Sequence, residues 1–231
     1  MRRFEKELTQ FISEEKTPNE DRLVLLCDGV FAIAMTLLIF GISLNVADKV
    51  PLVNKALPDL ISPTISYALT FFIIAMYWRS HRTLMKVVQR LDNAFISLTF
   101  LFLAFIAFFP ATSNLLGHYA DVPAVVVIYT LGLSGCGFSA LALWLYATWN
   151  HRLVAPDLPN DTINTRTYAL LLNPLIFCAS LLLLFVVPEP VYICFSWALI
   201  GFTYRFVQAV YKRWLEKPVQ ALIHRKHENP E

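Results

Sequence analysis

An acidic residue lies near the start of an apolar stretch that is long enough to cross a membrane. Residues 22–44 read RLVLLCDGVFAIAMTLLIFGISL, and Asp28 is the acid. A carboxylate is costly in hydrocarbon, so a helix that carries one is expected to border water or another helix. Arg22 lies six residues earlier, which is a poor spacing for a direct pair along one helix. The candidate partners on other segments are Arg79, His81, Arg82 and Asn93, and their cluster with Asp28 would be either structural or functional.

A second pattern follows the same stretch. A small or polar residue recurs every seven positions, and a row of large apolar side chains lies beside it on a helical wheel. The first row is Gly29, Thr36 and Ser43, and the second is Ile33, Leu37 and Phe40. Two interpretations stay open from spacing alone. The face could pack against another helix, or symmetric copies could bring the apolar side chains into rings that gate a pore by dewetting.

The elements that position these residues are expected to be membrane helices. The chain has 231 residues, of which 57% are hydrophobic, more than a soluble domain of this length carries. The apolar residues gather into six blocks, each long enough to span a bilayer. The blocks lie at 23–45, 60–80, 92–116, 123–149, 167–187 and 189–211. The predicted fold class is therefore an all-α integral membrane bundle of six transmembrane helices.

The distribution of positive charge predicts how the bundle is oriented. All but two of the 19 Lys and Arg residues fall on the two tails and on the connections that share their side of the membrane. Lys49 and Lys55 are the exceptions. By the positive-inside rule, both termini are cytoplasmic. We expect a cytoplasmic N-terminal tail at 1–21, one membrane domain at 22–213 and a cytoplasmic C-terminal tail at 214–231, in the plasma membrane of a bacterium.

Several classes of function find no support in the sequence. The net charge of +2 is too small to indicate a nucleic-acid partner. The four cysteines form no C-x-x-C pair, so neither a disulfide framework nor a zinc site is indicated. No protease, hydrolase or P-loop motif is present, and we expect no enzyme activity, no cofactor and no metal site. A proton-coupled secondary transporter that uses Asp28 and His81 remains the alternative to a channel.

The first apolar block resembles the defining motif of the transmembrane protein 175 family, whose members are potassium channels of lysosomes and their bacterial relatives. That motif runs R-x-x-x-F-S-D-x-x-x-A-I-x-x-T-L-L. Arg22, Asp28, Ala32-Ile33 and Thr36-Leu37-Leu38 stand at matching positions. Weaker matches follow in Tyr77 to His81, in Asn93 and in Pro110-Ala111-Thr112. Leu26 and Cys27 depart from the motif, and a thiol bonds more weakly than the hydroxyl of the family's serine.

The resemblance implies a homotetrameric, potassium-selective channel that lacks a carbonyl filter loop. Helix 1 of each subunit would line the central pore, with potassium as the ion in transit. By position, Ile33, Leu37 and Phe40 would form apolar constriction rings, and Thr36 would contribute to selectivity. A structural polar network would consist of Arg22, Asp28, His81 and Asn93. The partners would be other copies of the chain and the lipid bilayer.

Overall fold

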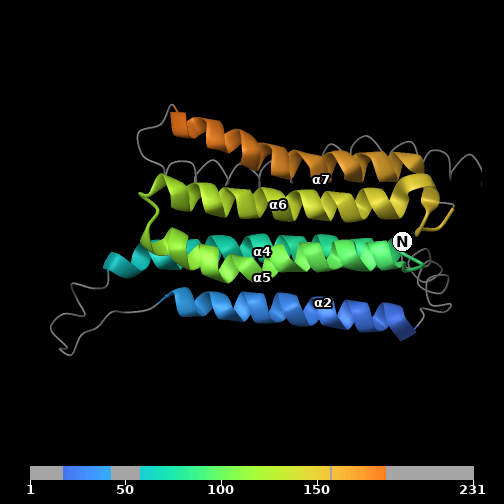
Figure 1. The fold of residues 1–231 in the computed structure, drawn as a ribbon, viewed down its shortest axis with the longest axis horizontal. Coiled ribbons are helices and arrows are strands. Elements are labelled where there is room, and N and C mark those ends of the chain that lie inside the picture. The colour runs from blue at the N-terminus through green and yellow to red at the C-terminus, as the bar shows by residue number, and fades with distance from the viewer. Residues whose placement is uncertain (1–17, 43–57, 157, 186–231) are drawn as a thin grey trace, which may run out of the picture.

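The computed structural model describes residues 18–42, 58–156 and 158–185, which form an α-helical bundle (Figure 1). Five of its helices are long and apolar enough to cross a membrane, which confirms the predicted fold class. The sixth predicted span, at 189–211, lies outside the described residues, as do the terminal tails at 1–17 and 214–231.

Some helices extend beyond the apolar blocks that predicted them. The bounds are α2 Pro18–Leu37, α4 Ile61–Val87, α5 Asn93–His118, α6 Pro123–Thr148 and α7 Asn160–Ser180. The prediction ended the second helix at 80 and began the fifth at 167, and both limits are wrong by about two turns. A run of apolar residues marks the part of a helix that lies among lipid tails. The backbone hydrogen bonds of the helix continue beyond this part into polar residues.

Short 3₁₀ segments continue or precede the long helices. They are η1 Leu38–Gly41, η3 Pro58–Leu60, η4 Trp149–His151 and η5 Leu181–Phe185. The first helix therefore ends near Gly41 rather than at the predicted residue 45. Phe40 lies in η1, where the tighter winding of a 3₁₀ helix changes the angle between successive side chains.

The helices are arranged with α2 at one side of the bundle and α7 at the other (Figure 1). α2 packs against α4 and α5, α5 packs against α6, and α6 packs against α7. α6 is the most buried of the five described spans. Small residues on α6 allow close contact between helices: a Cβ added at Gly137 would lie 2.9 Å from Cβ of Pro174 on α7.

A buried hydroxyl cluster joins three helices in the half of the bundle farther from Asp28. The Ser66 hydroxyl donates to the Ser113 carbonyl oxygen at 2.8 Å, and the Thr70 hydroxyl lies 2.9 Å from Oγ of Ser113 and 2.7 Å from the Tyr129 hydroxyl. These side chains come from α4, α5 and α6. Since hydrocarbon offers polar groups no partner, mutual hydrogen bonding satisfies them and fixes the helix register.

Candidate functional site

One side of α2 is buried in the bundle and the opposite side is open. The buried stripe is Leu23, Cys27, Phe31, Ala34 and Leu38, which recur every three to four residues. The open side is centred on the two rows predicted from the sequence: Ile33 is 60% exposed, Leu37 44% and Phe40 73%, and Gly29 and Thr36 are also exposed. Ser43 lies outside the described residues. Within the described residues, a single copy of the chain therefore leaves the predicted face exposed.

The Thr36 hydroxyl has a defined orientation on this face. It donates to the carbonyl oxygens of Ile33 at 2.9 Å and Ala32 at 3.1 Å, within its own helix. A hydroxyl has one proton and two acceptor lone pairs. Because the proton is directed back to the backbone, the oxygen of Thr36 is available as an acceptor on the exposed side. Such an oxygen can contact a partly hydrated cation.

Asp28 is held by a residue that was not among its predicted partners. Nε1 of Trp78 on α4 donates to Oδ1 of Asp28 at 2.8 Å. The guanidinium of Arg82 lies over the same indole, 5.4 Å from the ring centroid. The bond joins α2 to α4 near the Arg-rich end of the bundle. The indole N–H of a buried or interfacial tryptophan usually has a hydrogen-bond partner. Since Trp78 directly precedes the predicted candidate Arg79, this need for a partner is the signal that could have identified Trp78.

His81 lies in the same junction but contacts aromatic rings. It is only 6% exposed, and its imidazole stacks on Phe102 of α5, with ring centroids 5.6 Å apart and an interplanar angle of 13°. Phe31 of α2 lies on another side, with its centroid 6.2 Å away. Among the described residues no hydrogen bond joins His81 to Asp28. His81 thus fills the space where α2, α4 and α5 meet.

The other two members of the predicted polar network lie at the surface. Arg22 and Asn93 are both exposed, and neither forms a hydrogen bond with Asp28 within the described part of the chain. The carbonyl oxygen of Asn93 accepts the hydroxyl of Ser97 at 2.9 Å. The structure therefore brings Asp28 and His81 to one junction and leaves Arg22 and Asn93 apart from it.

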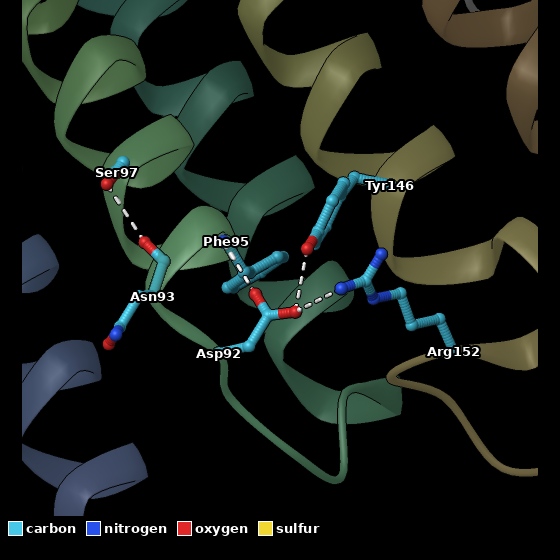
Figure 2. A network of polar contacts seen from close by, with 6 residues as sticks. All are labelled: Asp92, Asn93, Phe95, Ser97, Tyr146 and Arg152. Carbon is cyan, nitrogen blue, oxygen red and sulfur yellow. Dashed lines mark hydrogen bonds and ion pairs between the residues drawn. The ribbon is translucent and has the colours of Figure 1, made fainter.

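A cluster around Asp92, next to Asn93, was missed in the sequence (Figure 2). Oδ1 of Asp92 accepts the Phe95 backbone N–H at 2.8 Å, which caps the N-terminus of α5. Oδ2 accepts the Tyr146 hydroxyl at 2.7 Å and pairs with Arg152 at 3.2 Å. The Tyr146 hydroxyl, then the capping bond and Arg152, lower the pKa of this carboxyl below its usual value.

The same turn is joined to the α6–α7 connection through the backbone. The N–H of Gln89 donates to the Leu153 carbonyl oxygen at 2.8 Å, and Val88 and Val154 form an antiparallel bridge. We use the name Asp92 clasp for these backbone contacts together with the cluster of Asp92, Phe95, Tyr146 and Arg152. The clasp ties the α4–α5 turn to the segment that follows α6, so it fixes the end of α4 from which Trp78 reaches Asp28.

Comparisons with known proteins agree with the resemblance in α2. The family model described as endosomal/lysosomal potassium channel TMEM175 matches residues 22–110. A potassium channel of Streptomyces collinus is 30% identical over 139 residues, which are 58% of this chain and 68% of that protein. A potassium channel of Chamaesiphon minutus is 31% identical over 140 residues, which are 59% of this chain and 68% of that protein.

Solved structures share the fold. The crystal structure of a lysosomal potassium-selective channel TMEM175 homolog from Chamaesiphon minutus has a TM-score of 0.66 at 21% identity, and the likeness covers 84% of this chain and 98% of that one. The crystal structure of a variant of the potassium channel MtTMEM175, in complex with a nanobody fusion protein, has a TM-score of 0.54 at 18% identity, over 88% and 95% of the two chains. At these identities the structures support the architecture of the bundle.

Proposed function

This chain belongs to the TMEM175 family of potassium channels, and we propose that four copies of it form a potassium-selective channel with α2 lining a central pore. The observation that carries the proposal is the exposed side of α2, where Ile33, Thr36 and Phe40 lie opposite a fully packed stripe. A four-fold axis along this side would turn each exposed position into a ring. The positive-inside rule supports cytoplasmic termini, and the bacterial relatives support the plasma membrane as the location.

Each ring would have a distinct role in this pore. Ile33 would form the narrow apolar constriction, and Leu37 and Phe40 would form further rings that exclude water when they close. The oxygens of Thr36 would meet the ion. A continuous helix uses its carbonyl oxygens internally, so pore width, these hydroxyls and residual hydration would set selectivity. We therefore expect a modest preference for potassium over sodium.

The junction behind the pore would position α2. Asp28 is fixed to α4 through Trp78 and His81 fills the space beside Phe31, so a shift of α4 would move the pore-lining helix. Arg22 and Asn93 lie at the same end of the bundle and would complete this network in the assembled channel. No resident cofactor is needed, because potassium is the ion in transit.

The deciding experiment is electrophysiology of the purified protein in a bilayer, with potassium on one side and sodium on the other. The change Ile33→Asn should wet the constriction, raise conductance and move the reversal potential toward zero. Ile128→Asn is the matched control, since it makes the same change on an exposed side of α6, away from the proposed pore.

Two results would count against the proposal. An unchanged reversal potential and conductance in Ile33→Asn would remove Ile33 from the constriction. Flux that saturates with substrate and couples stoichiometrically to protons, without single-channel steps, would replace the channel by a secondary transporter that uses Asp28 and His81.

A further inference from the structure

The outer side of α4 carries a regular row that the channel proposal does not use. Ile65, Phe72, Arg79 and Lys86 are spaced by seven residues, so they drift by only about 20° per step around a helix and share one side. All four are exposed, with Ile65 at 62% and Phe72 at 69%. The row is therefore apolar over its first half and cationic over its second.

The position of the cations fits the thickness of a membrane. Ile61, which is also exposed on this side, lies about 27 Å along the helix from Arg79. This is close to the ~30 Å of hydrocarbon in a bilayer. If Ile61 lies at one boundary of the hydrocarbon, Arg79 reaches the other boundary, and Lys86 extends into the headgroup region.

Arg82 adds a third cation next to this row. Its guanidinium stacks 5.4 Å from the centre of the Trp78 ring, and tryptophan is the residue that membrane proteins favour at the level of the headgroups. Within the described residues none of Arg79, Arg82 and Lys86 forms an ion pair. Three positive charges thus lie within two turns of α4, directly beyond an apolar surface of acyl-chain length.

We propose that this surface, made of Phe72, Arg79, Arg82 and Lys86, binds an anionic phospholipid. The phosphate would lie between the three cations, and an acyl chain would run along Phe72 toward Ile65. Charge complementarity selects the headgroup, since each Lys or Arg near a bilayer surface strengthens the attraction of an anionic lipid several-fold. The proposal requires only that α4 spans the membrane, so it holds whether or not the chain conducts potassium.

The test is native mass spectrometry of the purified full chain with phosphatidylglycerol and phosphatidylcholine that carry identical acyl chains. We expect the wild-type protein to retain phosphatidylglycerol in preference to phosphatidylcholine. The double change Arg79→Gln with Lys86→Gln should weaken phosphatidylglycerol binding about thirtyfold. It spares Arg82, whose contact with Trp78 could affect the junction at Asp28. Arg90→Gln is the matched control, because Arg90 is an exposed cation of the α4–α5 turn, beyond the end of α4.

Any of three results would overturn the proposal. The first is equal retention of the two lipids by the wild-type protein, and the second is equal retention of phosphatidylglycerol by the wild type and the double variant. The third is a disulfide between copies in a Phe72→Cys variant with the native cysteines replaced, which would assign this side to a protein contact. Size-exclusion chromatography and thermal unfolding check the fold of each variant, and Lys86→Gln alone repeats the comparison if the double variant is unstable.

Discussion

At the scale of single residues, the most consequential contact is the hydrogen bond between Trp78 and Asp28. It gives an acid in a membrane helix a donor, and it fixes α2 to α4 at one defined height. The sequence indicated that Asp28 needs a partner, but the candidates were chosen by charge and amide character. A neutral indole donor meets the need without a second charge in a membrane helix, which would carry its own cost of desolvation.

Removing the indole N–H should therefore loosen α2. Trp78→Phe keeps an aromatic ring but leaves the Asp28 carboxylate without its donor, and a hydrogen bond to a charged group contributes about 1.5–3 kcal/mol. We expect a lower midpoint of thermal unfolding in detergent, and a smaller loss in Asp28→Asn, whose amide oxygen still accepts. Trp149→Phe is the control, since Trp149 is 71% exposed. Equal midpoints for Trp78→Phe and the control would show that the bond contributes little.

At the scale of elements, specific contacts hold two of the described connections between helices. The α4–α5 turn and the segment after α6 are held together by the Asp92 clasp, in which one carboxylate caps α5 and binds both Tyr146 and Arg152. Asn150 and His151 adopt positive φ angles of 49° and 52°, a conformation that costs free energy in residues other than glycine. The clasp holds the chain in this turn.

The clasp predicts a dependence of stability on acidic pH. The pKa of Asp92 is lowered below its usual 3.8 in the folded protein, chiefly by the Tyr146 hydroxyl. Because the pKa is lower in the folded protein, the ionised carboxylate stabilises the fold at pH values above the pKa of the unfolded chain. This contribution is lost as the pH falls through the pKa of the folded protein. Thermal midpoints measured from about pH 6 to about pH 3 should therefore fall at the acidic end in the wild-type protein.

Asp92→Asn separates this effect from general acid unfolding. An amide can still cap α5 but cannot titrate, so the variant should begin with a lower midpoint and change less between about pH 4 and about pH 3. Asp161→Asn is a matched control, since Asp161 is exposed in the first turn of α7. If the wild type and Asp92→Asn lose stability in parallel, the clasp does not contribute through the charge of Asp92.

Local patterns in the sequence predicted much of the fold, and they failed where distant segments meet. Apolar blocks located the five described spans, and helical periodicity identified the side of α2 that carries Ile33 and Thr36. Helix ends were missed because α4 continues through Arg79 and Lys86, where the hydropathy signal has already ended. Trp78 was missed because the candidate partners of Asp28 were chosen by charge and amide character. Asp92 was missed because its partner Tyr146 lies 54 residues away in the chain, a separation that no local pattern encodes.

At the scale of the whole molecule, a single chain has no pore among its described helices. α2 lies at the edge of the bundle, on the opposite side from α7 (Figure 1), and its side that carries Ile33 and Phe40 is exposed. This apolar side also displays the Thr36 hydroxyl and Gly29. Such a surface suits contact with other copies of α2 around a water-filled pore better than contact with lipid. The assembly in the proposed function would therefore complete the site, because one subunit would supply only one member of each ring.

This assembly predicts which positions on different subunits come together. A Thr36→Cys variant, with the native cysteines replaced, should form disulfide-linked dimers under mild oxidation. Position 36 would lie near the four-fold axis beside its neighbours, and each cysteine forms one disulfide. Tyr168→Cys is the control, since Tyr168 is 66% exposed on α7, at the other side of the bundle, and it should run as a single chain on a denaturing gel.

The number of chains that can be cross-linked in series distinguishes a four-fold assembly from a simple pair at the exposed side of α2. A second cysteine at Leu37, on the flank of the same face, gives each chain two reactive positions. A bifunctional thiol reagent should then connect neighbours on both sides, and the ladder on a denaturing gel should extend to four chains and no further. A ladder that stops at two chains would indicate that α2 pairs with a single partner helix, and the exposed side would then be a packing surface without a pore.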